Sequence, residues 1–327
     1  MEHAAPTLAA IAEARARLGD AILRTPTWHW QVPAVRARAG DIDVVLKLEL
    51  FQVTGSFKAR AAVLAAQHLD ADARARGLTA VSAGNHAIAV SYAAQRVGTT
   101  AKLVMPRSAD PRRVQTCRDL GGEVVLVEHV HAAFAEIDRI VAAEGRTFVH
   151  PFEGETVALG TGTIGVELLE DLPELDAVVV PIGGGGLCAG IAAAIKQMKP
   201  SCAVYGVEPT GADSMHKSFA AGSPQSIEAV RTIADSLGAP HAAPYSFALC
   251  RRYVDELVLV DDDALRDAMA MLFYQGKLAV EPAGAAATAA VLGKLHDRLQ
   301  GKQVAVIVCG GNVDAGVFAR HLGVTPS

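Results

Sequence analysis

The segment VVVPIGGGGLCAGIAAAIK, residues 178–196, joins three local patterns in a fixed order. It opens with three consecutive valines, which are typical of a strand buried on both faces of a sheet. The glycines Gly183 to Gly186 follow, and an alanine-rich helical stretch comes directly after them. A buried strand that runs through a glycine turn into a helix predicts an α/β fold with a parallel sheet.

The four glycines also indicate a ligand. Without side chains, they allow backbone N–H groups to close around an anion, and the start of the following helix adds partial positive charge. A phosphate group suits such a loop. However, Gly184, Gly186 and Ala189 also fit G-x-G-x-x-A, and Glu208 follows about 20 residues later, as in the dinucleotide-binding fingerprint. By itself, this segment leaves a nicotinamide enzyme and another phosphate ligand equally open.

Outward from this segment, short β-branched runs alternate with alanine-rich helical stretches. The expected strands lie at 44–50, 78–82, 101–105, 123–128, 147–150, 177–182, 202–208 and 304–309. The expected helices lie near 56–69, 85–97, 110–120, 131–143, 161–170, 186–197, 262–275 and 281–299. This alternation predicts two α/β lobes, each a mostly parallel sheet flanked by helices.

Composition restricts the possible partners and compartment. At about 150 residues per domain, 327 residues suggest two domains. The net charge of −5, without any block of like charge, argues against nucleic acid or a membrane surface as partner. Five cysteines without a C-x-x-C pair indicate reduced thiols in a cytoplasmic protein. No run of 18 apolar residues is present, so we expect no membrane span.

Three further junctions join the end of a strand to a polar loop. Lys58 lies where a polar loop enters an apolar helix; partial desolvation there would lower its pKa and favour a nucleophile or base, although most lysines are simply solvated. The loop SAGNH (82–86) either caps a helix or holds a carboxylate at the helix start. Cys309 ends a strand before two glycines, as a buried structural thiol also would.

In this order, GSFKAR (55–60), SAGNH (82–86), GGGGL (183–187) and CGGN (309–312) resemble the pyridoxal-phosphate enzymes of fold type II, which are similar to the tryptophan synthase β subunit. The branch that the chain most resembles contains threonine/serine dehydratases, which are ammonia-lyases, and serine racemases. The resemblance covers nearly the whole chain. It makes the dinucleotide interpretation remote, because a nicotinamide enzyme leaves the lysine, asparagine and CGGN loops unexplained.

The resemblance implies a role for each matching residue. Lys58 would bind pyridoxal 5′-phosphate covalently and act as the catalytic base, with Phe57 packed against the ring. Asn85 would bond the ring 3′-oxygen, and Cys309 would face the pyridine nitrogen. The phosphate loop would consist of Gly183, Gly184, Gly185, Gly186 and Leu187. The substrate-carboxylate loop would consist of Ser82, Ala83, Gly84, Asn85 and His86.

The resemblance also implies a domain division, an assembly and an activity. A large cofactor-binding domain would comprise 1–51 and 151–327, and a small domain 52–150, in a homodimer or higher homo-oligomer. The expected activity is dehydration of a β-hydroxy amino acid of the threonine/serine class to a 2-keto acid and ammonia. At the position of the SAGNH loop, racemases of the family have a loop that resembles S-S-G-N-H, whose second serine protonates Cα. Ala83 occupies that position here, which favours the dehydratase.

Two departures from the family pattern concern metal and substrate. In the segment from Glu208 to Ser214, Glu208 and the Ala212 carbonyl match the cation ligands of metal-binding relatives, but Ser214 stands where an aspartate is expected. A structural Glu208 and a weak ion site are equally open, and we assign no metal ligand. Ser236 stands where many relatives have glycine, so the preferred substrate need not be threonine. The alternatives are a serine racemase, a dehydratase of a bulkier or acidic 3-hydroxy amino acid, and, remotely, an NAD-dependent dehydrogenase. A ligand sensor without turnover is disfavoured because Lys58 is present.

Overall fold

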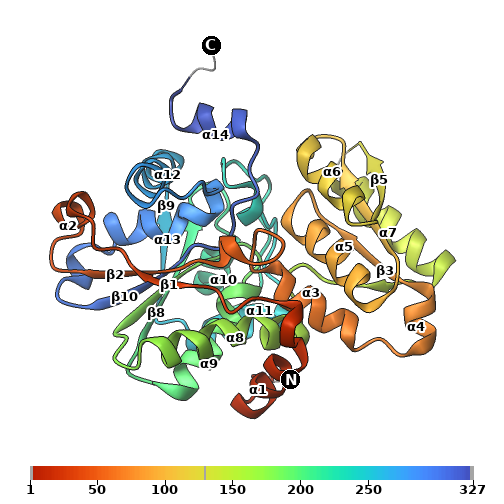
Figure 1. Cartoon of the computed structure of the whole chain (residues 1–327), viewed down its shortest axis with the longest axis horizontal. Coiled ribbons are helices and arrows are strands. Elements are labelled where there is room, and N and C mark those ends of the chain that lie inside the picture. The colour runs from red at the N-terminus through yellow and green to blue at the C-terminus, as the bar shows by residue number, and fades with distance from the viewer. Residues whose placement is uncertain (1–2, 129, 325–327) are drawn as a thin grey trace.

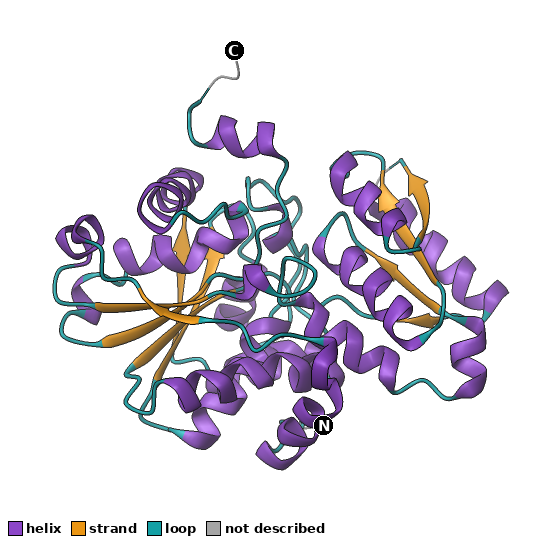
Figure 2. Cartoon of the chain, viewed as in Figure 1, coloured by secondary structure: helices purple, strands orange, loops and turns teal. Residues whose placement is uncertain are grey.

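The structure, a computed structural model, describes residues 3–128 and 130–324 and contains two sheets flanked by helices (Figures 1 and 2). The six-stranded sheet has the order β1-β2-β10-β7-β8-β9, and the four-stranded sheet the order β5-β4-β3-β6. The first consists of β1 (Thr27–His29), β2 (Asp43–Lys47), β7 (Ala177–Pro181), β8 (Ala203–Pro209), β9 (Glu256–Val260) and β10 (Gln303–Ile307). The second consists of β3 (Leu78–Val81), β4 (Ala101–Pro106), β5 (Glu123–Val127) and β6 (Thr147–Phe148).

Within the described ranges, every strand pairing is parallel except that of the edge strand β1 with β2. Parallel neighbours need long crossover connections, and helices supply them. The two mostly parallel sheets with flanking helices confirm the predicted fold class.

Helices cover both faces of each sheet. In the larger lobe, α13 contacts β7 to β10 from one face and α9 contacts β7 and β8 from the other (Figure 1). In the smaller lobe, α5 and α7 both contact β3 and β4, while α3 packs on α5 and α8 and so connects the lobes. The helices are α1 (Leu8–Leu18), α2 (Pro33–Ala39), α3 (Lys58–Gln67), α4 (Ala71–Arg76), α5 (Asn85–Val97), α6 (Pro111–Asp119), α7 (Val130–Glu144), α8 (Glu155–Asp171), α9 (Gly186–Met198), α10 (Ser214–Ala221), α11 (Pro244–Tyr253), α12 (Asp262–Gly276), α13 (Pro282–Leu292) and α14 (Ala315–His321).

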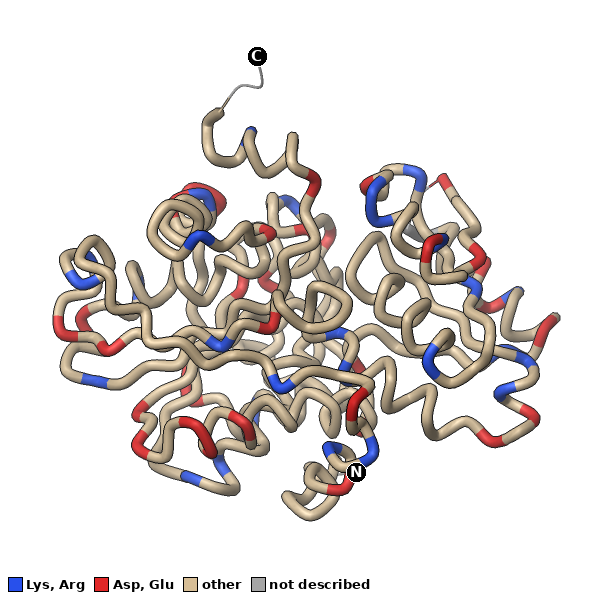
Figure 3. The backbone as a smooth tube through the Cα atoms, viewed as in Figure 1, with Lys and Arg blue, Asp and Glu red and all other residues tan. Residues whose placement is uncertain are grey.

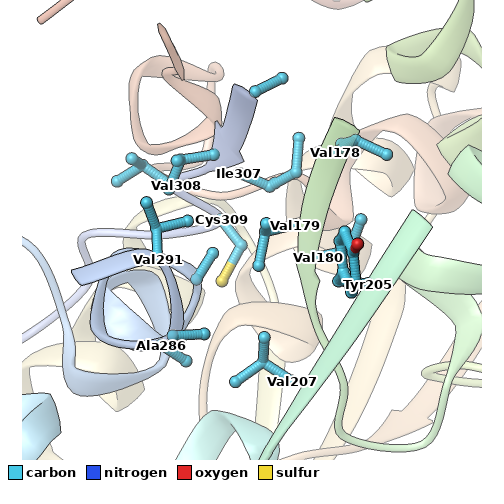
Figure 4. Packing of buried hydrophobic residues seen from close by; sticks show 14 of the residues in the cluster. Val178, Val179, Val180, Tyr205, Val207, Ala286, Val291, Ile307, Val308 and Cys309 are labelled. Atoms are coloured by element: carbon cyan, nitrogen blue, oxygen red, sulfur yellow. The ribbon is translucent and has the colours of Figure 1, made fainter. Parts of the chain in front are cut away.

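The core of the larger lobe forms around the central strand β7. Val178, Val179 and Val180 are fully buried, and they pack with side chains of β8, β10 and α13 (Figure 4). Because both faces of this strand are covered, its sequence is continuously apolar rather than alternating. The valine run that opened the sequence analysis therefore lies at the centre of the sheet.

Several predicted elements have different bounds in the structure. The strand expected at 44–50 ends at Lys47, and a 3₁₀ turn, η2 (Glu49–Phe51), follows it. The helix expected at 281–299 ends at Leu292. Strands β1 and β9 and the helices α2, α4, α10, α11 and α14 were not among the predicted elements. Residues 209–256, for which the sequence predicted no regular element, contain α10, α11 and a 3₁₀ turn, η3 (Asp235–Leu237).

The predicted domain boundaries at 52 and 151 remain a prediction, although strands β3 to β6 all lie between them. Acidic and basic residues are interspersed over both lobes (Figure 3). No helix within residues 3–128 and 130–324 is long and apolar enough to cross a lipid bilayer.

Candidate active site

One pocket lies where the carboxyl ends of β3, β7 and β10 meet the loops of the smaller lobe, and its volume is about 180 Å³. Ligands of open α/β sheets bind at such strand ends. The pocket brings together every residue that the sequence nominated for cofactor or substrate, and it adds others. Its walls include Phe57, Lys58, Ser82, Ala83, Gly84, Asn85, His86, Arg113, Phe152, Gly183, Gly184, Gly185, Gly186, Leu187, Asp235, Ser236, Glu281 and Cys309.

The glycine loop follows β7 and has no room for side chains. A Cβ on Gly184 would lie 2.2 Å from the ring of Phe152, and one on Gly186 would lie 2.4 Å from the Phe152 carbonyl oxygen. Gly185 has a φ of 95°, a conformation that favours glycine. Helix α9 begins at Gly186, so its partial positive charge is directed at the loop.

The backbone N–H groups of this loop form a row of unused donors. Among the described residues, none accepts a hydrogen bond from the N–H of Gly183, Gly184, Gly185, Gly186 or Leu187. Buried backbone donors are almost always paired in proteins, so a row of unpaired ones on a pocket wall indicates a missing anion. The loop therefore fits a phosphate group.

Lys58 is the first residue of α3 and its amine faces the same pocket. The amine donates a hydrogen bond to the Pro151 carbonyl and lies 4.9 Å from the centre of the Phe57 ring. No carboxylate in the described part of the chain forms an ion pair with it. Burial lowers the pKa of Lys58 from its usual 10.5 to about 8, against a smaller opposing effect of Cys309 and Glu281. About a tenth of this amine is therefore uncharged at pH 7, far more than for a solvated lysine, and the uncharged form is the one that a nucleophile or base requires.

The SAGNH loop joins β3 to α5. The backbone N–H groups of Asn85, His86 and Ala87 have no acceptor among the described residues, as expected at the start of a helix. The Asn85 side chain donates to Glu281 (2.6 Å) and accepts from Asn312 (2.7 Å). Ala83 is exposed on the pocket wall. The loop thus offers free backbone donors where the sequence predicts a substrate carboxylate.

His86 takes part in this loop as a neutral side chain. Its Nε2 lies 2.8 Å from the Val149 carbonyl oxygen, to which it donates. Burial, together with the nearby Lys58 charge, lowers the pKa of His86 to about 3. Its imidazole is therefore uncharged at neutral pH, and what it offers a carboxylate is its backbone N–H.

Cys309 follows β10 and lies beside the lysine loop. The Cys309 carbonyl accepts a hydrogen bond from the Phe57 N–H (3.1 Å), and the Gly55 carbonyl accepts one from the Gly311 N–H (2.9 Å). Burial raises the pKa of the Cys309 thiol well above its usual value, with Glu281 adding to the effect. The thiol, visible in Figure 4, is therefore neutral.

Among the charged and aromatic residues of the pocket, sequence reasoning missed four: Arg113, Phe152, Asp235 and Glu281. Glu281 carried one local signal, since an acidic residue directly before Pro282 is typical of a helix start. Burial raises the pKa of Glu281 to about 7, although Arg113 opposes the shift. Asp235 directly precedes Ser236, which the sequence analysis connected with the substrate, whereas the segments of Arg113 and Phe152 gave no such signal.

Glu208 explains why the dinucleotide pattern is misleading here. Its carboxylate accepts the backbone N–H groups of Met215 (2.8 Å) and His216 (2.7 Å) at the start of α10. It is buried and does not line the pocket. The acidic residue that would bind a ribose therefore caps a helix instead.

Comparison with known proteins gives consistent matches over the chain. The family model described as "Pyridoxal-phosphate dependent enzyme" matches residues 18–310. The chain is 53% identical to the phenylserine dehydratase of Ralstonia pickettii over 320 residues, which cover 98% of this chain and 97% of that protein. It is 40% identical to the L-threonine ammonia-lyase of Thermotoga maritima over 315 residues, covering 96% and 77% of the two chains. Among solved structures, maize serine racemase has a TM-score of 0.92 at 34% identity and covers 98% of both chains.

Proposed function

Because the chain belongs to the family of pyridoxal-phosphate-dependent enzymes, we propose that it is a dehydratase that converts a β-hydroxy amino acid to a 2-keto acid and ammonia. The observation that carries this proposal is the arrangement of one pocket, in which the Lys58 amine and a row of unpaired glycine amides line the same cavity. A phosphate-bearing aldehyde needs both features. Pyridoxal phosphate, when bound, supplies an electron sink for the charge that develops when Cα loses its proton.

The pocket residues that would hold the cofactor offer unpaired backbone N–H groups, the Lys58 amine, or side chains that would contact the ring. The backbone amides of Gly183 to Leu187 would bind the phosphate, and Lys58 would bind the aldehyde carbon. Asn85 and Phe57 would contact the ring. The neutral thiol of Cys309 suits a pyridine nitrogen that is not held in its protonated form, because it cannot balance a positive charge as a carboxylate would.

The chain's own groups then define the reaction. The free backbone donors of the SAGNH loop orient the substrate carboxylate at the start of α5. The Lys58 amine, released when substrate binds, removes the Cα proton as a general base with a suitably lowered pKa. The β-hydroxyl leaves as water, and addition of one water later releases ammonia and the 2-keto acid. Ala83 has no proton to return to Cα, which favours elimination over racemisation.

The β-substituent is the finer part of the proposal. We propose an aryl group, so that 3-phenylserine is preferred over threonine and serine. The name of the Ralstonia pickettii relative supports this choice. The pocket supports it too, since the Phe152 ring on its wall is part of an aromatic cluster with His150 (4.7 Å) and His241 (5.7 Å between ring centres).

Assembly and location belong to the same proposal. We propose a homodimer or higher homo-oligomer, which is supported by the exposed apolar side chains of Leu23, Phe51 and Val53 around Gln52. Sedimentation velocity tests it. A cytoplasmic location is supported by five cysteines that are all unpaired.

The test combines the visible spectrum of the purified protein with ammonia release. We expect a yellow protein whose absorption is lost on borohydride treatment and whose cofactor becomes fixed to the Lys58 peptide. Lys58→Ala should lose both signals and reduce turnover of 3-phenylserine by about a thousandfold. Lys294→Ala, which changes an exposed lysine, serves as the matched control. A colourless protein that binds a nicotinamide nucleotide would falsify the proposal.

A further inference from the structure

Arg113 connects the two lobes at the pocket. It lies on α6 of the smaller lobe, yet its guanidinium bonds three groups of the larger lobe. Nη1 donates to Asp235 (2.5 Å), Nη2 to Glu281 (3.3 Å), and Nε to the Asn312 carbonyl (2.8 Å). Only 8% of its side chain is exposed. The charge of Arg113 is therefore already paired before any substrate binds, most closely with Asp235.

The guanidinium also lies within reach of a bound substrate. A Cβ on Gly84 would be 2.9 Å from Arg113 Nη1, so the arginine packs directly against the SAGNH loop. Arg113 and Asp235 both line the pocket, and both also line a second cavity. A ligand in the pocket is consequently close to both charges of this ion pair.

No other cation of the pocket is free for a second substrate carboxylate. The basic residues among the described lining are Lys58, His86 and Arg113. Lys58 is engaged by the reaction under the proposed function, and the imidazole of His86 is neutral and bonded to Val149. Only Arg113 remains, and Asp235 and Glu281 already occupy it.

We propose that Asp235 is a specificity-determining residue: by pairing with Arg113, it restricts the pocket to β-hydroxy amino acids with an uncharged β-substituent and excludes those with a second carboxylate. The inference rests on the proposed dehydratase function and names the substrate class of the same site. Its physical basis is like-charge repulsion, since a substrate carboxylate would meet Asp235 while the balancing cation is already used.

The decisive variant is Asp235→Asn, which keeps an oxygen acceptor for Arg113 but removes the negative charge. We expect the ratio of kcat/KM for 3-hydroxyaspartate to that for 3-phenylserine to rise by about tenfold or more. Asp263→Asn is the matched control: it makes the same change in net charge on α12, where the side chain is 94% exposed. It should leave the ratio unchanged.

Binding of an unreactive dicarboxylate provides a second measurement that does not depend on turnover. Malonate should bind the Asp235→Asn holoenzyme about tenfold more tightly than wild type, whereas propionate should bind both equally. Adding Arg113→Gln to Asp235→Asn should abolish the increase in malonate affinity, because the guanidinium that would bind the second carboxylate is then absent. Calorimetric titration of the holoenzyme gives all these constants.

The outcomes separate this inference from the proposed function. Wild-type protein that releases ammonia from none of the β-hydroxy amino acids defeats the proposed function, and the malonate titration still decides the role of Asp235. Active wild type with an unchanged substrate ratio and unchanged malonate affinity in Asp235→Asn overturns the inference alone. So does wild type that already prefers 3-hydroxyaspartate to 3-phenylserine.

Discussion

Two groups of charges each include a residue from the first turn of α3, and they differ in how completely they are paired. The first, here called the α3 network, consists of Lys47, Glu49, Arg60 and Glu167, with side chains at most 2% exposed. The second, the pocket group, consists of Lys58, Arg113 and Glu281. Lys58 and Arg60 are two residues apart on one helix, yet they belong to different groups and have opposite properties.

The carboxylates of the two groups show what pairing does. Glu167 contacts Lys47 (2.7 Å) and Arg60 (2.7 Å), and although burial opposes it, these cations lower the pKa of Glu167. Glu281 contacts Arg113 alone among cations, at 3.3 Å, and shares it with Asp235. There burial dominates and raises the pKa of Glu281 to about 7. Equal burial therefore yields a permanent charge in one place and a titratable group in the other.

The cations follow the same rule. Burial opposes the charge of Arg60, but Glu49 and Glu167 outweigh it and raise its pKa. Lys58 donates to the Pro151 carbonyl and has no ion-pair partner among the described residues, and burial lowers its pKa to about 8. Two nearby residues of α3 therefore have different roles. The fully paired Arg60 attaches the helix to the larger lobe, whereas Lys58, half a turn earlier and without an ion-pair partner in the described part of the chain, keeps a reactive amine.

The largest expected effect comes from breaking the α3 network. Arg60→Met keeps the length of the side chain but leaves Glu49 and Glu167 without their main partner. We expect a loss of about 3–5 kcal/mol in the free energy of unfolding, because a buried ion pair with one partner removed leaves an uncompensated charge. Urea unfolding of the apo-protein measures it.

The control is Arg96→Met, which removes a surface ion pair with Asp20. Exposed pairs contribute about 0–1 kcal/mol, so this variant should unfold close to wild type. If Arg60→Met were no less stable than Arg96→Met, the α3 network would not be the anchor that its geometry indicates.

The contribution of the pocket group to the stability of the protein should depend on pH, because Glu281 titrates. The folded protein holds a proton on Glu281 up to about pH 7, whereas the unfolded chain loses it near 4.5. Since the folded state binds more protons between these values, this residue makes wild type less stable as pH rises through that window. Glu281→Gln removes the effect, so the variant should gain on wild type by roughly 3 kcal/mol between pH 4.5 and 7.

Below pH 4.5 the carboxyl is protonated in both states, so there the stability difference between Glu281→Gln and wild type should be constant. Above pH 7 it should be constant again. Melting temperatures of the apo-proteins across this range test the prediction. A stability difference that does not change with pH would show that the pKa of Glu281 is not raised in the folded protein.

The parts of the site that sequence could predict are those built from consecutive residues. Two local patterns were visible in the sequence: the run Gly183 to Gly186, and the position of Lys58 at a loop–helix junction. The order of the four motifs along the chain then indicated the family. The valines before the glycines predicted the central strand for the same reason. Features that depend only on neighbouring residues in the chain can be predicted without knowing the fold.

The parts that could not be predicted depend on contacts between distant segments. Arg113, Asp235 and Glu281 come from α6, η3 and the start of α13, and only the closed fold brings them together. The strand expected at 44–50 ends early for a related reason. Lys47 and Glu49 both bind distant segments through the α3 network, and the chain turns into η2 at Glu49.

The smallest expected effect tests the contrast between Lys58 and Arg60 most directly. Only an uncharged amine attacks an aldehyde, so the rate at which apo-protein takes up pyridoxal phosphate should rise about tenfold per pH unit below the pKa of Lys58 and level off above about 8. Stopped-flow absorbance measures this rate, and Nα-acetyl-lysine, with a pKa of about 10.4, is the reference amine. If uptake by the apo-protein kept rising beyond pH 9.5 as the reference does, burial without a carboxylate partner would not be what makes Lys58 reactive. The difference between the two groups of charges would then be one of position alone.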